Sequence, residues 1–350
     1  MTATDFAPDA LELFDTADRD AIVQLLTFAH AHRNEPHSLE VERDNLLGAV
    51  TWANHQGAWQ LVIAFSETIA SFLELRGHWT DRESLLSKAV EAARTLNDQR
   101  ALARILGDLA TTYWHRGQWE QAEHLYQQAL PMSEQLGDRK TAGRLYANLG
   151  TLCAEQGNWE TATHYLTRSL EIMHELNDLE SVAQTYVNLA TVYAEKGDYT
   201  VAIEYNRRGL ELSRGLGDPR IVANALANLG TVYIQIRQWE RAAALLMEAL
   251  QGFERVGEVH GVAQTYANLG LVFSGQGDPN KALSCYEVAL RTMQGLGDLA
   301  GAASMHINAA ATYAEYHEFD LATDFYGRAV EVLEPIGDVR TLTRVYLSLA

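Results

Sequence analysis

Apolar residues in this chain recur at helical spacing, and each helical stretch closes on a short polar turn. In residues 179–218 the first apolar stripe is Tyr186, Leu189, Ala190 and Tyr193, and the second is Ala202, Tyr205, Gly209 and Leu212. Spacings of three and four residues place each stripe on one face of a helix. The segment therefore predicts two helices, over 179–196 and 199–216. No stretch alternates apolar and polar residues for long enough to predict a strand.

A glycine followed by an aspartate separates the predicted helices. Gly197 stands just past the first helix, where a left-handed backbone is common and glycine adopts it cheaply. The Asp198 carboxylate can accept the unpaired N–H groups that open the next helix. Gly217-Asp218 repeats the same arrangement one helix later.

The whole pattern recurs every 40 residues without insertion or deletion. The clearest column is an asparagine followed by two small or apolar residues: Asn148, Asn188, Asn228, Asn268 and Asn308. A fixed period of this size is typical of stacked repeats, in which each unit buries its apolar face against its neighbours. The sequence therefore predicts an all-α solenoid of seven helix pairs, over residues 59–98, 99–138, 139–178, 179–218, 219–258, 259–298 and 299–338.

One repeat carries a familiar motif. Tyr266-x2-Leu269-Gly270-x2-Phe273 is followed by Ala282-x3-Tyr286, and this resembles the signature of the tetratricopeptide repeat. The unit is longer than the usual repeat of about 34 residues, and a Gly-Asp pair replaces the closing proline. Both departures resemble the longer repeats of kinesin light chain and of Pins-type polarity adaptors. The resemblance covers about residues 59–350, and it implies a right-handed superhelix whose first helices line the concave side.

The two ends of the chain are predicted to cap the repeats. Residues 1–58 predict an N-terminal helical cap, with helices over 18–33 and 38–55 joined near Pro36. The stretch 39–53 and the following Arg76-Gly77-His78-Trp79 also resemble the start of the repeat (sensor) domain in STAND-type signalling ATPases, although the chain contains no Gly-x4-Gly-Lys-Ser/Thr loop. A plain capping pair is the alternative. Residues 339–350 predict a C-terminal capping helix that packs on the helix over 319–336.

Composition and charge limit the partners and the cellular location that we expect for this protein. The net charge of −19 and the pI near 5.0 argue against nucleic acid or an anionic membrane as a partner. Residues 1–14 are acidic and lack the apolar core of a signal peptide, and no apolar run reaches the roughly 18 residues that span a bilayer. Cys153 and Cys285 read as small core residues and do not indicate an oxidising compartment. We expect a cytoplasmic protein.

The asparagine column is the main candidate for a binding site. On a helical wheel it falls on a polar stripe, away from the apolar stripe of its own repeat. Asparagine is a poor interior helix residue, and its amide can match the C=O and N–H of a peptide unit. Similar asparagine rows line the peptide grooves of O-GlcNAc transferase, the Pins-type adaptors and bacterial peptide-pheromone receptors, which implies peptide binding here. The alternative is that each amide bridges to the adjacent repeat and sets the superhelical pitch.

Residues one or two turns away from the asparagines are expected to flank the groove. They are Arg104, Arg144, Gln184, Asn224, Gln264, Glu155, Glu195, Gln235 and Glu315. The arginines form an early basic region, whereas the glutamates favour a ligand with basic or amide character; a solvated helix face is the alternative. Aromatic residues also recur at the start of the second helices, where we expect them to pack between helices: Trp79, Trp119, Trp159, Tyr199, Trp239 and Phe319.

No enzyme motif is present. The sequence lacks His-Glu-x2-His, Gly-x-Ser-x-Gly and Cys-x2-Cys, so we expect no catalysis, no metal and no cofactor. Two functions remain. The first is a scaffold that binds an extended peptide or partner segment in the groove, as a sensor module of a signalling protein. The second is a small-molecule-sensing domain, by analogy with maltose-type transcriptional activators. A polar trough would favour the first, and a closed apolar pocket the second.

Overall fold

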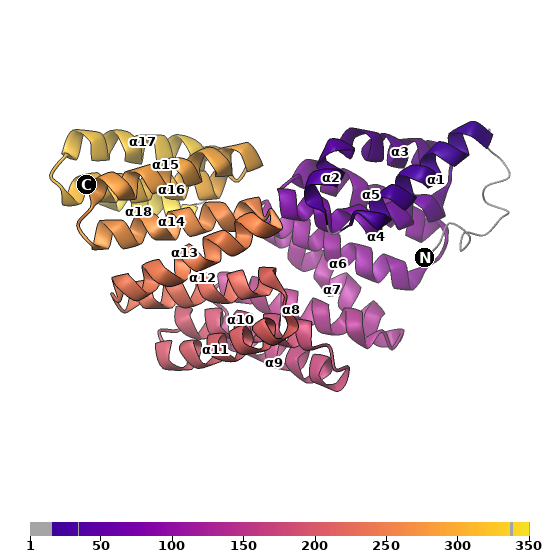
Figure 1. Ribbon diagram of the computed structural model, residues 1–350, viewed down its shortest axis with the longest axis horizontal. Helices are drawn as coiled ribbons and strands as arrows, with labels where there is room; N and C mark the ends of the chain where they lie inside the picture. Colours follow the sequence, from indigo (N-terminus) through magenta and orange to yellow (C-terminus); the bar gives the residue numbers. More distant parts are fainter. Residues whose placement is uncertain (1–15, 34, 337–338, 350) are drawn as a thin grey trace. The chain divides into compact units, whose positions relative to one another are not determined.

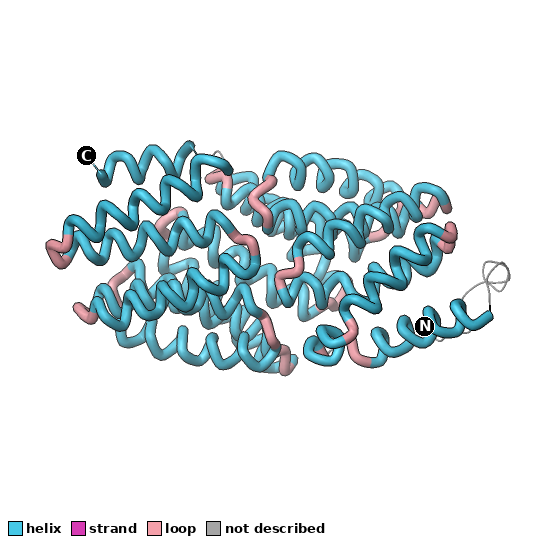
Figure 2. Tube along the Cα trace, turned by 90° about the horizontal axis from the view of Figure 1, so that it is seen from above, coloured by secondary structure: helices cyan, strands magenta, loops and turns pink. Residues whose placement is uncertain are grey.

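The computed structural model describes residues 16–33, 35–336 and 339–349. Part of the expected N-terminal cap (residues 1–15), the repeat-end pair Gly337-Asp338 and the final Ala350 lie outside the described residues. Within that range the chain folds into 18 helices and no strand (Figures 1 and 2), which confirms the predicted all-α solenoid. The helices form two compact units, divided between Ile172 and Met173 inside α9 (Trp159–Glu175), and each unit is described separately.

The first unit begins with three helices that precede the repeats and continues in pairs. The bounds are α1 (Thr16–Ala31), α2 (Pro36–Val41), α3 (Arg43–His55), α4 (Trp59–Arg76), α5 (Trp79–Thr95), α6 (Gln99–His115), α7 (Trp119–Gln135) and α8 (Arg139–Glu155). The second unit contains α10 (Leu179–Glu195), α11 (Tyr199–Leu216), α12 (Pro219–Gln235), α13 (Trp239–Val256), α14 (Val259–Gly275), α15 (Pro279–Leu296), α16 (Leu299–Glu315), α17 (Phe319–Ile336) and α18 (Val339–Leu349). The pair predicted over 179–216 thus corresponds to α10 and α11.

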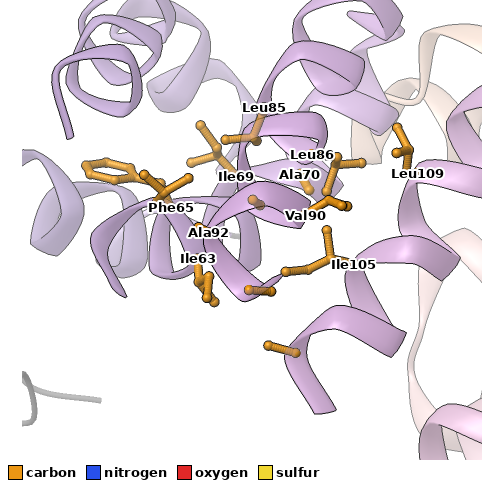
Figure 3. Close-up of a cluster of buried hydrophobic side chains, with 14 of the residues drawn as sticks. Ile63, Phe65, Ile69, Ala70, Leu85, Leu86, Val90, Ala92, Ile105 and Leu109 are labelled. Atoms are coloured by element: carbon orange, nitrogen blue, oxygen red, sulfur yellow. The ribbon is translucent and has the colours of Figure 1, made fainter. Parts of the chain in front are cut away.

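The core of the first unit shows why the helices pair. Apolar stripes of α4, α5 and α6 interlock in one cluster, drawn in Figure 3, which includes Phe65, Ile69, Leu85, Leu86 and Ile105. All five side chains are buried, and three successive helices contribute to the cluster. Each apolar stripe is therefore covered by the helices before and after it rather than by a separate layer.

The single helix expected over 38–55 is interrupted at Glu42, so that prediction was wrong. Glu40 and Arg43, on either side of the break, both reach the turn between α4 and α5: Glu40 accepts hydrogen bonds from Arg76 (2.9 Å) and His78 (2.9 Å). Burial disfavours the charged carboxylate of Glu40, but the bonds from His78 and Arg76 outweigh it and lower its pKa. This polar cluster ties α2 and α3 to the first repeat.

The Gly-Asp turns form as predicted. Gly197 and Gly217 have positive φ angles of 81° and 74°, and Asp198 and Asp218 each accept hydrogen bonds from the backbone at the start of the next helix. Arg237 and His317, which replace glycine in this column, adopt the same left-handed backbone with φ angles of 57° and 64°. A side chain there costs about 1–2 kcal/mol relative to glycine, so the repeat geometry prevails over local preference.

The aromatic column packs between helices only in part. Trp79 is 6% exposed and stacks on His115 (ring centroids 4.6 Å apart), and Trp239 lies against Gly275. Trp119, Trp159 and Phe319 are 45%, 40% and 61% exposed, contrary to expectation. For Trp119 the residue equivalent to His115 is Glu155, which offers no flat ring to cover the indole.

One buried position in the second helices breaks the repeat pattern. The residue four after the conserved alanine is large and buried in most repeats: Tyr126, Leu166, Leu246, Tyr286 and Tyr326. In α11 it is Asn206, which is 0% exposed and whose two amide atoms make no hydrogen bond with the described residues. A Cβ atom added at Gly150 or Gly230 would lie within 2.6 Å or 2.8 Å of the Leu166 or Leu246 side chain. Ala190 occupies the equivalent position opposite the smaller Asn206.

We expect the double variant Ala190→Gly/Asn206→Leu to be more stable than the natural chain by about 2 kcal/mol. It reproduces the Gly–Leu pair of two other repeats, removes a buried amide that lacks partners and adds buried apolar surface, against a cost of about 1 kcal/mol for glycine in a helix. Urea denaturation measures the change. Ala190→Gly alone is the control and should destabilise the protein; a double variant that is no more stable than the natural chain would contradict the argument.

His306 is a second polar side chain in the core. It lies in α16, is 7% exposed, and its Nδ1 has no hydrogen-bond partner among the described residues. Burial lowers the pKa of the imidazole and Arg328 of α17 lowers it further, while Asp324 acts in the opposite direction. The folded protein therefore prefers the neutral ring.

Because the pKa of His306 is lower in the folded state, its neutral form contributes stability above the unfolded pKa near 6.5, and this is lost as pH falls below that value. We expect His306→Tyr, which matches Tyr146 and Tyr266 of other repeats, to reduce the fall in melting temperature between about pH 7.5 and pH 5. The exposed His164, replaced in the same way, is the control. An unchanged fall in the His306 variant would show that other groups govern acid sensitivity.

The last described helix packs on its predecessor. Val345 of α18 is 1% exposed and lies in one cluster with Leu333 and Tyr326 of α17. The outer side of α18 nevertheless carries Tyr346 and Leu347, which are 49% and 74% exposed. A helix that ends a solenoid usually has a polar outer side, so the outer side of α18 is more apolar than that of a typical cap.

Candidate functional site

The five asparagines occur one per repeat in the first helix of each pair. Asn148 lies in α8 of the first unit, and the other four lie in α10, α12, α14 and α16 of the second. In the second unit these first helices are neighbours in that order, so their exposed sides form one surface. We call it the first-helix face; in the first unit, α4, α6 and α8 form the corresponding face. All five asparagines are half-buried, neither enclosed in the core nor fully solvated.

Three asparagines bridge to the preceding repeat. The side-chain nitrogen Nδ2 donates to a threonine hydroxyl from Asn148 to Thr111 (3.3 Å), from Asn228 to Thr191 (3.0 Å) and from Asn268 to Thr231 (3.2 Å). Each threonine hydroxyl in turn donates to the carbonyl four residues earlier in its own helix, as Thr231 does to Ala227 (3.1 Å). Its lone pair therefore remains available to the asparagine. We call each of these Asn–Thr hydrogen bonds a rung. The rungs fit the alternative that the amides bridge adjacent repeats and set the superhelical pitch.

The rungs leave part of each amide unused. No described residue donates to the carbonyl oxygen of Asn148, Asn228 or Asn268, and none of these oxygens is fully buried. One carbonyl oxygen and the second N–H of each amide thus remain for another partner. Asn188 differs because its carbonyl oxygen accepts a hydrogen bond from Gln184 (2.9 Å).

Asn308 is the member of the row that bridging does not explain. The position that supplies the threonine in other repeats is Leu271 in α14, which is 36% exposed and has no hydroxyl group. The side chain of Asn308 makes no hydrogen bond with the described residues, and neither of its amide atoms is fully buried. Its whole amide is therefore available.

We expect Thr231→Val to lower the free energy of unfolding by about 1 kcal/mol, because Asn268 loses its acceptor while the size of the side chain is kept. Leu271→Thr should restore the missing rung to Asn308 and raise stability by up to about 1 kcal/mol. Thr323→Val is the matched control, since among the described residues its hydroxyl bonds only to Phe319 of its own helix. Chemical denaturation compares the three, and equal losses for Thr231→Val and Thr323→Val would mean that the rung contributes nothing.

The flanking residues divide into three groups. Glu155 and Glu315 accept hydrogen bonds from the preceding repeat, from Trp114 (2.6 Å) and Ser274 (3.3 Å) respectively, and so act partly as further inter-repeat ties. The second group lines the first-helix face of the second unit with polar, mostly uncharged side chains: Gln184, Glu195, Asn224, Gln235 and Gln264. Arg104 and Arg144 form the third group, and the structure brings these two together.

The two arginines line a recess on the first-helix face of the first unit. The recess has a volume of about 290 Å³, and α4, α5, α6 and α8 contribute its walls. Its lining residues are Ser66, Glu67, Ala70, Ser71, Glu74, Arg82, Arg104, Ile105, Asp108 and Arg144. It is a polar depression rather than a closed apolar pocket.

Three ion pairs cross the recess from helix to helix. Arg104 of α6 pairs with Glu67 of α4, Arg144 of α8 pairs with Asp108 of α6 (3.0 Å), and Arg82 of α5 pairs with Glu74 of α4 (2.7 Å). The guanidinium of Arg82 also donates to Ala70, Asp108 and Thr112, and its side chain is only 3% exposed. Arg82 is thus a buried side chain held by several hydrogen bonds, whereas the Arg104 and Arg144 side chains are 33% and 46% exposed.

The sequence contained signals for some of the residues it did not nominate. Asp108 stands one period before Asn148, so it belongs to the asparagine column, and Thr111, Thr191 and Thr231 recur at the same period. Glu67 and Arg82 have no such periodic counterpart. Their role depends on which side chains of neighbouring helices meet, which the pattern within one repeat does not report.

Two features are absent from the described part of the chain. No cluster of three or more His, Cys, Asp or Glu side chains there could hold a metal ion. In the same part, no helix combines the length and the apolar character needed to cross a membrane. Cys153 and Cys285 are half-buried free thiols, and burial raises the pKa of both, which disfavours the reactive thiolate.

Sequence comparison identifies the repeats. A family model described as tetratricopeptide repeat matches residues 61–135, 141–215 and 221–295. No curated protein sequence matches the chain significantly.

Solved structures share the fold at low identity. A Rap protein complexed with Competence and Sporulation Factor is 16% identical with a TM-score of 0.69, covering 94% of this chain and 90% of that one. The Rap conjugation gene regulator of plasmid pLS20, in complex with the Phr* peptide, is 13% identical with a TM-score of 0.67, covering 84% and 78%. A STAND protein with a tetratricopeptide repeat sensor from Pyrococcus horikoshii is 18% identical with a TM-score of 0.59. That match covers 97% of this chain, which spans about half (53%) of the STAND protein.

Proposed function

Because the chain belongs to the tetratricopeptide repeat family, we propose that it is a protein-interaction scaffold that holds an extended peptide segment of a partner on its first-helix face. The observation that carries the proposal is the row of half-buried asparagines, in which the amides of Asn148, Asn228, Asn268 and above all Asn308 keep hydrogen-bonding groups unused by the described residues. A structural role in the rungs accounts for one N–H of three asparagines, but it does not account for Asn308.

The chemistry of the row suits a peptide backbone. An amide presents a donor and an acceptor side by side, as a peptide unit does, so a row of amides can bind an extended chain irrespective of its side chains. The rungs also hold the asparagines in place before a ligand arrives, which lowers the entropic cost of binding. Bridging and binding are thus compatible in the same residue.

Charge indicates what kind of segment fits the second unit. Across α12, α14 and α16, Arg220 and Glu315 are the only Asp, Glu, Lys or Arg residues, in a chain with a net charge of −19. A ligand charge would find few partners there and would lose hydration. We therefore expect the segment bound by these helices to be uncharged and rich in small or polar residues.

The structural comparisons support a peptide ligand by analogy. Two proteins of the same fold are named as complexes with a signalling factor or a peptide, Competence and Sporulation Factor and Phr*. The STAND protein that resembles this chain carries its repeats as a sensor, which supports a role as the sensor module of a signalling protein. A small-molecule sensor is the second candidate, and the recess beside Arg104 and Arg144 is the observation that favours it.

We expect Asn308→Ala to weaken peptide binding by about tenfold while leaving the melting temperature unchanged or slightly raised, because its amide has no partner in the described residues and alanine is the better helix former. The probe is a peptide selected from a random display library on the wild-type protein, and its affinity is measured by fluorescence anisotropy.

Asn280→Ala on the exposed surface of α15 is the matched control and should bind the peptide normally. Asn228→Ala removes a rung and a candidate contact together, so it should lower both stability and affinity. Selected peptides that bind the Asn308 variant as tightly as the wild type would remove the row from the proposal. Failure to select any peptide would argue against peptide binding on this face.

A further inference from the structure

Charges of opposite sign alternate across the recess of the first unit. From α4 to α8 the order is Glu67, Arg104 with Asp108 one helical turn further on, and then Arg144. With the Glu74–Arg82 pair, the lining contains three acids and three arginines, so its formal charge is zero in a chain of net charge −19. A balanced, alternating lining differs from the acidic charge balance of the chain as a whole.

The two ion pairs made by Arg104 and Arg144 leave hydrogen-bond donors and acceptors unused. A guanidinium has five N–H donors, yet Arg104 and Arg144 each bond to a single carboxylate among the described residues. The second oxygens of Glu67 and Asp108 likewise accept no bond from the described residues. Two guanidinium groups and two carboxylate oxygens with unused hydrogen-bonding capacity therefore line the same recess. Arg82, by contrast, is buried and donates to Glu74, Ala70, Asp108 and Thr112.

The arrangement discriminates between classes of ligand. An anion that approached Arg104 and Arg144 would be repelled by their carboxylate partners, and a cation would be repelled by the arginines. A molecule whose cationic and anionic groups are attached to the same carbon atom can satisfy both sets at the spacing of an ion pair. The volume of about 290 Å³ lies at the lower end of ligand pockets, which suits a molecule of roughly ten non-hydrogen atoms.

We infer that this recess binds a free α-amino acid, with its carboxylate on Arg104 and Arg144 and its ammonium group on Glu67 and Asp108. Ser66 and Ser71 add hydroxyl groups to the wall, and Ile105 and Ala70 supply the small apolar part. The site lies in the first unit, and it does not depend on peptide binding by the asparagine row.

The test is a binding screen with the intact chain. Each of the common L-amino acids is titrated into the protein by calorimetry and by thermal shift, and every one that binds is compared with its N-acetyl and carboxamide derivatives. We expect saturable binding of at least one amino acid, and a loss of about tenfold or more in affinity when either charge is masked. A peptide that begins or ends with the amino acid that binds keeps only one of the two charged groups on that residue. Such peptides should therefore bind weakly as well.

Variants assign the binding to the recess. Arg104→Gln and Asp108→Asn should each weaken binding by about tenfold or more, and Arg208→Gln, which breaks an exposed ion pair with Glu204 on α11, should not. Circular dichroism confirms that each variant is folded. The inference is overturned if no amino acid binds saturably, if masked derivatives bind equally well, or if the folded recess variants bind like the wild type. None of these outcomes bears on Asn308, so this test and that of the peptide proposal fail separately.

Discussion

Each repeat of this chain has an apolar surface that its own two helices cannot cover. The stripes of α4, α5 and α6 meet in a single cluster, so the helix of one repeat completes the core of the next. Everything else in the molecule accommodates this nearest-neighbour burial. Arg237 and His317 accept a left-handed backbone because the repeat must turn there, and Asn206 is buried in the core although its amide makes no hydrogen bond with the described residues.

The same constraint brings polar residues of successive repeats together on the opposite side of the first helices. Stacking at a fixed spacing places Asn228 beside Thr191 and Asn268 beside Thr231. In the first unit the rung from Asn148 to Thr111 is kept, and one helical turn earlier Arg144 and Asp108 add an ion pair between the same two helices. The columns that place Arg144 and Asp108 in the first unit place Gln264 and Asn228 in the second. Substitutions at a few positions can therefore give an uncharged row in one unit and a charged recess in the other.

Much of the fold could be predicted from the sequence because it is determined within one period. Apolar spacing gave the helices, and Gly197-Asp198 with its equivalents gave their ends. The break at Glu42 could not be foreseen, because it accompanies hydrogen bonds that Glu40 accepts from Arg76 of α4 and from His78 in the turn after it. The site divides in the same way. A helical wheel placed Asn148 and Arg144 on the polar side, but only the packing of helices reveals that Thr111 and Asp108 are their partners.

The absence of a hydroxyl at Leu271 has a mechanical consequence. Between α12 and α14 a polar tie joins Thr231 to Asn268, which lies near the middle of α14. Between α14 and α16 the ties lie toward the two ends instead. Ser274 contacts Thr312 (3.4 Å) and Glu315 (3.3 Å) near the C-terminal ends, and His260 lies 3.5 Å from Asp298 at the N-terminal ends. No hydrogen bond among the described residues joins the Asn308 side chain to α14 between these ties. Apolar packing thus holds the middle of α14 and α16, and the two helices can separate there while their ends stay joined.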